Sequence, residues 1–216
     1  NDGWTTFMLT LSNVDVVKLL LDNSERIELN ATHDNGMTAF MIACDDGNFD
    51  VVKLLLDHAN LNIEVNAGTN YGWTAFIWAC INRHINVVRL LLDNSERIEL
   101  NARTNNGRTA FMWACMDGHK DLIQSFLDHS SPNIDLNARD NHGSTPFMNA
   151  CLFGHKDVVQ LLLEHSERIE LNARNNYGVT AFMRACISGH KHVVQLLLDN
   201  SEKIELNART NNGMTA

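Results

Sequence analysis

The chain repeats one short motif at an almost constant interval. A Gly separated by one residue from a Thr occurs at Gly3, Gly36, Gly72, Gly107, Gly143, Gly178 and Gly213. Successive positions differ by 33, 36, 35, 36, 35 and 35 residues. A fixed period of this length is typical of a small supersecondary unit that stacks many times on its own copies. The repeat therefore predicts a solenoid of about six units, in which each unit packs only against its neighbours.

Each interval begins with a short helix. In the interval from residue 104, Thr109 stands at the N-cap position, where its hydroxyl can accept a backbone N–H bond. Phe111, Ala114 and Cys115 then follow the spacing of one helix face, and Gly118 is placed to end the helix in a left-handed conformation. The equivalent residues elsewhere are the N-caps Thr38, Thr74, Thr145 and Thr180 and the terminators Gly47, Gly154 and Gly189.

A second helix and a long loop complete the interval. The apolar residues of 156–163 cover more than one narrow stripe, so this helix is expected to be buried between neighbours. A polar stretch (166–168) and an extended Ile-Glu-Leu segment (169–174) follow, which predicts a finger-like hairpin or loop. Extra residues at 24–26 and 130–133 are expected to lengthen a surface loop without disturbing the stack, because loop length costs little free energy.

Two positions depart from the common pattern. Thr5 and Val16 are 11 residues apart, whereas the equivalent Thr38 and Val51 are 13 apart, so the first interval should have a shorter turn between its helices. Arg83 stands where other intervals have a helix-ending Gly. A positive φ at Arg83 would cost about 1 kcal/mol.

The recurring pattern Gly-Xaa-Thr-Ala-Phe-Met-Xaa-Ala-Cys-Xaa-Xaa-Gly-His, with Val-Val-Xaa-Leu-Leu-Leu and Leu-Asn-Ala, resembles the ankyrin repeat. The resemblance covers essentially the whole chain and implies an all-α ankyrin-repeat solenoid of stacked helix-turn-helix units joined by hairpin-like finger loops. Ala usually replaces the Pro of the family signature, and Phe replaces its Leu. The signature His, which ties neighbouring loops in the family, is replaced at Met41, Ile77, Met112, Met148 and Met183.

We expect residues 1–216 to form a single elongated array. Its units start near residues 1, 33, 69, 104, 140 and 175, and a partial unit starts at 210. Arrays of this kind normally finish in atypical units with polar outer faces. Neither end of this sequence has such a unit, so we expect it to be a segment of a longer protein.

Composition limits the classes of partner. The formal net charge of −9 argues against nucleic acid, whose phosphates need Lys and Arg for neutralisation. The sequence has no apolar run near the roughly 18 residues of a membrane span, so direct membrane insertion is not expected.

The five cysteines recur at one position per interval: Cys44, Cys80, Cys115, Cys151 and Cys186. Packed helices lie about 8–10 Å apart, whereas the Cα atoms of a disulfide must approach within about 7 Å. The ladder is therefore predicted to be reduced and buried, and its spacing does not suit a tetrahedral metal site. Reduced thiols favour an intracellular, cytoplasmic location, and a protein delivered into a host cell would look the same.

The sequence gives little support for a catalytic function. His119, His155 and His190 follow the helix-ending Gly, and His84 follows Arg83. No nucleophile or carboxylate accompanies them in a repeated constellation, so a turn-stabilising role is predicted. No Gly-Lys-Ser or Gly-Lys-Thr loop is present to cradle phosphate. We predict no catalytic residue, no cofactor and no metal.

Function is expected where the intervals differ from one another. Positions after the turn Gly and in the first helix vary most, and they carry aromatic and Arg side chains, the types that dominate binding hot spots. In the family this surface is a concave groove that binds other proteins, so the resemblance implies a non-catalytic module for a protein partner, working as a monomeric array. The predicted contact residues are Tyr71, Trp73, Trp78, Arg108, Trp113, Asn149, Phe153 and Arg184.

Other interpretations of these features stay open. The Trp rings could simply pack against neighbouring helices, and the array could be a spacer or spring in a larger membrane-linked or cytoskeletal protein. A ladder of Arg103, Arg139, Arg174 and Arg209 is either neutralised by the acidic residue four positions earlier or forms a basic edge for an acidic partner. Asn101, Asn137 and Asn172 resemble asparagines that are hydroxylated in animal ankyrin repeats.

Overall fold

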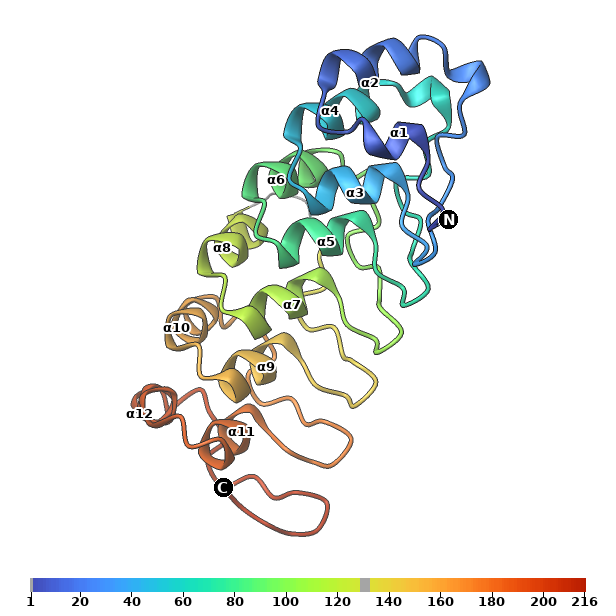
Figure 1. Ribbon diagram of the computed structural model, residues 1–216. Helices are drawn as coiled ribbons and strands as arrows, with labels where there is room; N and C mark the ends of the chain where they lie inside the picture. The colour runs from blue at the N-terminus through green and yellow to red at the C-terminus, as the bar shows by residue number, and fades with distance from the viewer. Residues whose placement is uncertain (1, 129–132) are drawn as a thin grey trace. The chain divides into compact units, whose positions relative to one another are not determined.

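The computed structural model describes residues 2–128 and 133–216 (Figure 1). Residues 130–132 of one predicted loop extension lie outside the described residues. The chain divides into two compact units, Asn1–Asn105 and Asn106–Ala216, and each is described by itself. That the two units continue as one array stays a prediction.

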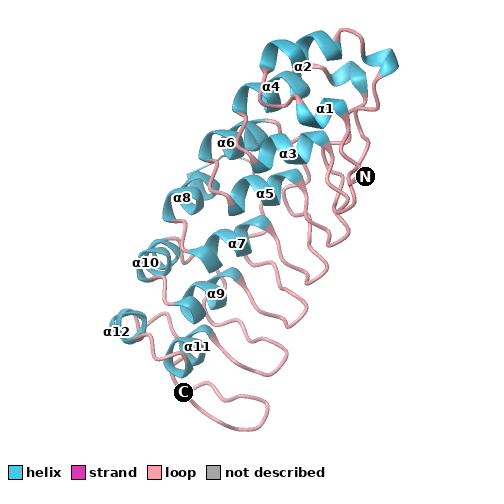
Figure 2. Ribbon diagram, viewed as in Figure 1, coloured by secondary structure: helices cyan, strands magenta, loops and turns pink. Residues whose placement is uncertain are grey.

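Helices account for the regular structure of both units (Figure 2). Unit 1 contains α1 (Thr6–Leu9), α2 (Val14–Leu21), α3 (Ala39–Asp45), α4 (Phe49–Asp57), α5 (Ala75–Ile81) and α6 (Ile85–Asp93), with 3₁₀ turns at Ser24–Arg26 and Ala59–Leu61. Unit 2 contains α7 (Ala110–Asp117), α8 (Lys120–Asp128), α9 (Pro146–Phe153), α10 (Lys156–Glu164), α11 (Ala181–Ile187) and α12 (Lys191–Asp199). The predicted all-α repeat fold is confirmed, and β-pairing in the described residues is limited to isolated bridges such as Thr32 with Thr38.

Each unit is built from two layers of helices. In unit 1, α3 packs against α1 and α5, and α4 packs against α2 and α6. Unit 2 repeats this arrangement, with α9 between α7 and α11 and α10 between α8 and α12. A long loop precedes each first helix after α1 and projects away from the helical layers (Figure 1). We call the first-helix layer of a unit, together with these loops, its first-helix face, and the other layer its second-helix face.

Threonine caps every first helix, as predicted. The Oγ1 atom of Thr109 accepts a hydrogen bond from the backbone N–H of Met112 at 3.3 Å, and Thr38 and Thr180 do the same for the residues three positions later. Pro146 occupies the first turn of α9, where its missing N–H would have no helical partner in any case. The caps fix where each first helix starts, and so where its exposed positions lie.

The turn between the two helices uses a left-handed residue in each repeat after the first. Gly118 has φ 75° and Gly154 has φ 76°. Arg83 adopts φ 58° in the same role, so the left-handed conformation considered for this position is observed. Except after Gly47, the next residue is a histidine. Its ring reaches back one repeat: Nε2 of His155 bonds the carbonyl oxygen of Met116 at 2.6 Å, and His190 bonds that of Leu152 at 2.8 Å.

His84 makes the equivalent bond to Asp45 in unit 1, at 2.7 Å. The turn-stabilising role predicted for the histidines is therefore confirmed at three positions. For His119 it stays a prediction.

Asparagines join neighbouring loops. Asn172 accepts the N–H of Glu205 at 2.7 Å and donates to the carbonyl of Lys203 at 2.8 Å, and Asn137 bonds Glu170 and Arg168 in the same way. These bonds hold the Ile-Glu-Leu segments as turns, and no strand forms there among the described residues. Loop stiffening therefore comes from Asn side chains.

Four of the five predicted buried thiols are in the core. Cys44, Cys80, Cys115 and Cys151 are fully buried and free, and burial raises the pKa of each thiol. The prediction is wrong for Cys186, which is partly exposed. Its helix α11 packs against α9 and α12.

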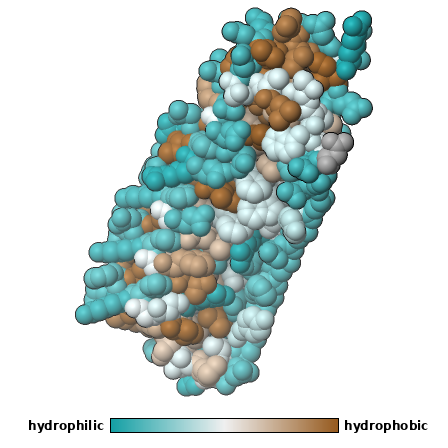
Figure 3. All heavy atoms as spheres, in the orientation of Figure 1, coloured by the Kyte–Doolittle hydropathy of each residue, from teal (hydrophilic) through white to brown (hydrophobic). Residues whose placement is uncertain are grey.

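The first repeat is incomplete in its packing. Helix α1 has only 4 residues, whereas α3 has 7. The segment between α1 and α2 spans residues 10–13, against 46–48 between α3 and α4, so the predicted shorter turn is wrong and the first helix is shorter instead. Leu9 of α1 and Leu19 of α2 keep 68% and 62% of their surface exposed. Brown hydrophobic side chains gather over this end of unit 1 in Figure 3.

Candidate functional site

Two tryptophans pack together on the first-helix face of unit 1. Trp73, in the loop before α5, and Trp78, within α5, have ring centroids 4.9 Å apart at an interplanar angle of 30°. Both rings are partly exposed, and the buried Nε1 of Trp78 has no hydrogen-bond partner. Tyr71, at the tip of the same loop, is 66% exposed. The structure thus brings these three predicted residues onto one surface, where part of the aromatic area serves internal packing.

The same face of unit 1 is hollowed at its N-terminal end. Trp4, Met37 and Ile42 line a depression of about 330 Å³ together with Asp45 and His33. The ring of Trp4 stacks on the imidazole of His33, with centroids 5.2 Å apart. Most of the residues that line this hollow are apolar, and Asp45 and Asp46 lie at it as well. Burial raises the pKa of the Asp45 carboxyl, and the hydrogen bond from Asn82 and the charge of His84 oppose this rise.

Arg108 and Trp113 form the corresponding contact in unit 2. The guanidinium carbon of Arg108 lies 5.1 Å from the centroid of the Trp113 ring, within the range of a cation–π interaction. The Nε atom of Arg108 lies 3.9 Å from Oδ2 of Asp140. Loop and helix therefore present an aromatic ring and a positive charge side by side.

Asp140 is a buried carboxylate that organises its loop. Its side chain is 4% exposed, and Oδ1 accepts the backbone N–H groups of His142 and Ser144, both at 2.9 Å. Arg184, from α11, reaches the same loop, and its Nη2 donates to the Oγ of Ser144 at 2.9 Å. Burial lowers the pKa of Arg184 and the charge of Asp140 opposes that shift.

Asn149 and Phe153 lie on α9, one helical turn apart. Asn149 is only 4% exposed, and its Nδ2 is buried without a hydrogen-bond partner. Phe153 is 46% exposed, and its ring stacks with the imidazole of His155 at a centroid distance of 6.5 Å. Of these two predicted contact residues, Phe153 has a side chain that a ligand could contact. The side chain of Asn149 is buried and has an unsatisfied amide donor.

Sequence reasoning missed Asp140 and did not place Ser144 among the contact residues. The sequence did contain a signal for Asp140. The equivalent loop positions hold the uncharged residues Thr69, Thr104 and Asn175, so Asp140 is the charged residue of this set. Its proximity to two arginines was not readable, since they come from residues 32 positions before it and 44 positions after it.

The charge ladder of unit 2 pairs across repeats. Arg139 binds Glu170 at 3.2 Å and Arg174 binds Glu205 at 3.1 Å. Each arginine thus pairs with an acidic residue of the next repeat, which agrees with the interpretation of a ladder that neutralises its own charge. Both partners of each pair are about half-exposed, so the ion pairs add little stability.

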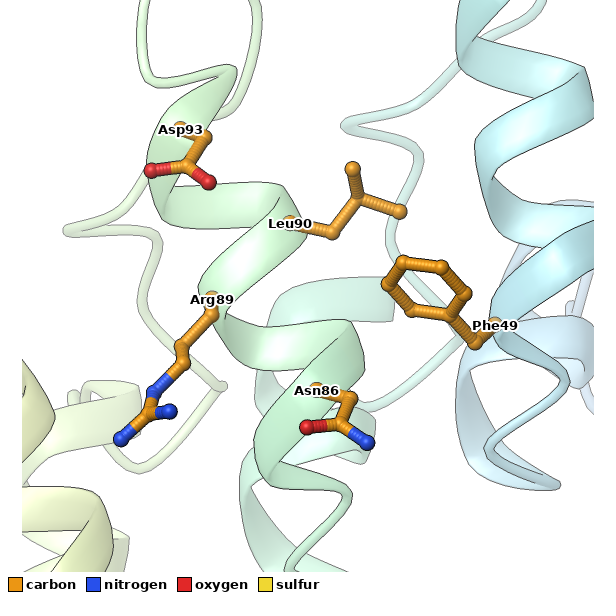
Figure 4. Close-up of a pocket in the computed structure, with 5 residues that line it drawn as sticks. All are labelled: Phe49, Asn86, Arg89, Leu90 and Asp93. Carbon is orange, nitrogen blue, oxygen red and sulfur yellow. The ribbon is translucent and has the colours of Figure 1, made fainter.

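The second-helix face of unit 1 carries a different kind of hollow. Phe49 of α4 and Leu90 of α6 line a shallow depression with Asn86, Arg89 and Asp93 (Figure 4). None of the predicted contact residues lies there. Within residues 2–128 and 133–216, no group of three or more His, Cys, Asp or Glu side chains could hold a metal ion, and no helix is long and apolar enough to cross a membrane.

Comparison with known proteins adds the family. Profiles of ankyrin repeats match residues 7–104, 95–175 and 155–198. None of the curated proteins matches the chain. The matches cover most of the chain and agree with the capped first helices, the left-handed turns and the loops of both units. The chain belongs to the ankyrin-repeat family.

Proposed function

We propose that the protein is a non-catalytic interaction module whose first-helix faces bind a protein partner. Ankyrin repeats are generally protein-interaction modules, which supports the general role. The observation that carries the proposal is the aromatic and Arg pairing on this face: Trp73 on Trp78 in unit 1 and Arg108 on Trp113 in unit 2. Large rings held rigid by a neighbour bind with little loss of side-chain entropy.

The surroundings of these rings fit such a role. Trp78 and Trp113 lie on helices whose opposite side is core, since Phe76, Ala79, Phe111 and Ala114 are at most 2% exposed. A surface of this kind is preorganised, and it does not need to fold when the partner arrives. The four buried thiols fit a reducing, intracellular compartment.

A spacer role has its own support. Bidentate Asn side chains join successive loops, through Asn66 in unit 1 and through Asn137 and Asn172 in unit 2. Regular junctions of this kind would also suit an elastic scaffold. A spacer depends on the stack alone and would tolerate loss of the exposed rings.

Capture of proteins from a lysate of the source cells separates the two functions. We would compare the native chain with Trp78→Ala and Trp113→Ala, and use Phe49→Ala as the control, because Phe49 is a partly exposed ring on the second-helix face. Helicity measured by circular dichroism must be equal for all four. A protein captured by the native chain and Phe49→Ala, but lost in either Trp variant, supports the interaction module. Equal capture by all four, or none, favours the spacer.

A further inference from the structure

Two arginines share one carboxylate on the first-helix face of unit 2. Arg108 lies 3.9 Å from Oδ2 of Asp140, and Arg184 is within electrostatic reach of the same group. Oδ1 of Asp140 is already occupied by two backbone N–H groups. Two guanidinium groups therefore lie near one carboxylate, in a chain whose formal net charge is −9.

The cluster also holds polar donors that the chain does not satisfy. The Nε of Arg184 and the Nδ2 of Asn149 are both buried without a hydrogen-bond partner. Asn149 occupies in α9 the position that Arg184 occupies in α11, and these two helices pack side by side. A buried donor without an acceptor lowers the stability of the folded chain. A ligand that brings acceptor oxygens to this place would remove that penalty.

The unsatisfied donors of Arg184 and Asn149, one of them on a guanidinium group, favour an anionic oxygen as the ligand atom. We propose that this arginine cluster (Arg108, Asp140, Ser144, Asn149 and Arg184) binds an Asp or Glu side chain from an extended segment of the protein partner. Guanidinium donors match a carboxylate in geometry, and such charge-assisted bonds are about twice as strong as neutral ones. Rotation of the Asn149 amide about its last bond would let the side chain take part as a donor.

The apolar surface beside the arginine cluster indicates which type of residue is next to the Asp or Glu of the partner segment. Trp113 lies under Arg108, and Phe153 is exposed at the end of α9. The segment is therefore expected to carry an aromatic or aliphatic residue next to its Asp or Glu. This inference rests on the proposed function, because it names the partner chemistry for one of the two first-helix faces.

A displayed library of random linear peptides, selected on the whole chain, provides the probe. We expect enriched sequences that contain Asp or Glu beside an apolar residue. A synthetic peptide of the enriched sequence is then compared by calorimetry with its amide form, in which Gln or Asn replaces the acid. The amide form should bind at least about tenfold more weakly.

Variants of the chain assign the site. Arg184→Gln should lower the affinity for the acidic peptide by a similar factor and leave the affinity for the amide peptide nearly unchanged. The double-mutant cycle would then show coupling between Arg184 and the carboxylate of the peptide. Arg174→Gln is the control, because it removes the same charge from an exposed position of unit 2 that pairs with Glu205. It should change both affinities less than twofold.

Each other outcome overturns the inference in a recognisable way. Enriched peptides without acidic residues, whose binding depends on Trp113, would leave the proposed function standing and refute the carboxylate. A phosphoserine peptide that binds tenfold tighter than the acidic one would assign the cluster to phosphate. Equal losses of affinity for the acidic peptide in Arg184→Gln and Arg174→Gln would show that only long-range electrostatic attraction contributes, and not a site at Arg184. No enrichment at all would count against the inference and the proposed function together.

Discussion

The imidazole ring of His155 packs directly against the backbone of Gly118, one repeat earlier in unit 2. A Cβ atom on Gly118 would collide with Nδ1 of that ring, while Nε2 holds the carbonyl of Met116 at 2.6 Å. The pair recurs as Gly154 with His190 and, in unit 1, as Gly47 with His84. The glycine thus serves both the left-handed turn of its own repeat and the seating of the next repeat.

Gly118→Ala should destabilise unit 2 through both effects. The left-handed backbone costs an L-residue about 1–2 kcal/mol, and displacement of His155 adds the loss of its bond, about 1 kcal/mol. Urea unfolding followed by circular dichroism measures the sum. Gly189→Ala is the matched control, because Gly189 has φ 71° but nothing within 4 Å of its added Cβ. Equal losses in the two variants would show that the histidine contact contributes nothing.

Arg83→Gly should stabilise unit 1. Arg83 holds φ 58° with a Cβ atom in place, so its replacement removes left-handed strain of about 1 kcal/mol. Part of this gain is lost, since Gly gives the unfolded chain more freedom. A thermal midpoint that rises by a few degrees is expected. A lower midpoint would mean that the contacts of the Arg83 side chain outweigh the strain.

Asn172→Ala should weaken the junction between two loops of unit 2. The substitution removes bonds to the backbone of Glu205 and Lys203, worth together about 1–2 kcal/mol for partly exposed groups. Asn207→Ala is the control at the equivalent residue of the next repeat, because the side chain of Asn207 is exposed and makes no such bond within the described residues. Chemical unfolding should find the first variant destabilised and the second nearly neutral. Similar values for both would refute the junction role.

Thiol reactivity should separate Cys186 from the other four cysteines. Alkylation needs the thiolate, and burial raises the pKa of Cys44, Cys80, Cys115 and Cys151 while covering them completely. One thiol should therefore react in the folded protein and four only on unfolding, as counted by mass spectrometry. Cys186→Ser should abolish the fast reaction. Fast labelling of any other cysteine would contradict the burial.

The same thiols predict how stability depends on pH. Their pKa values are raised in the folded state, so the folded protein binds more protons than the unfolded one above the ordinary thiol pKa of about 8.5. The stabilisation is complete below that pH and falls above it, by up to about 1.4 kcal/mol per pH unit for each buried thiol. Urea midpoints at pH 8 and pH 10 measure the loss, and Cys115→Ala should reduce it.

Local chemistry explains why much of the fold was predictable. Thr109, Pro146 and Gly118 act on the backbone within a few residues of themselves. The threonine recurs in every first helix and the glycine in most repeats, so a prediction for one repeat is checked by the others. Cys186 shows the limit, because burial depends on a neighbouring repeat and not on the repeated motif itself.

The candidate site was predictable only as a set of variable positions. The variable first-helix position that holds Trp78 and Trp113 could be identified from the sequence. The meeting of Arg108 with Asp140 and the reach of Arg184 to Ser144 depend on side-chain conformation across repeats. The Arg139–Glu170 pair was not predicted for a similar reason, since it joins two adjacent repeats.

The central claim is that the first-helix faces bind a protein partner, and the affinity of a captured partner for the Trp113→Ala variant tests it most directly. Calorimetry with the purified partner should give a dissociation constant at least about tenfold weaker than for the native chain, as expected for a hot-spot aromatic residue. Phe49→Ala, on the second-helix face, should bind within twofold of the native value. Equal affinities for the native chain and both Trp113→Ala and Trp78→Ala would contradict the account.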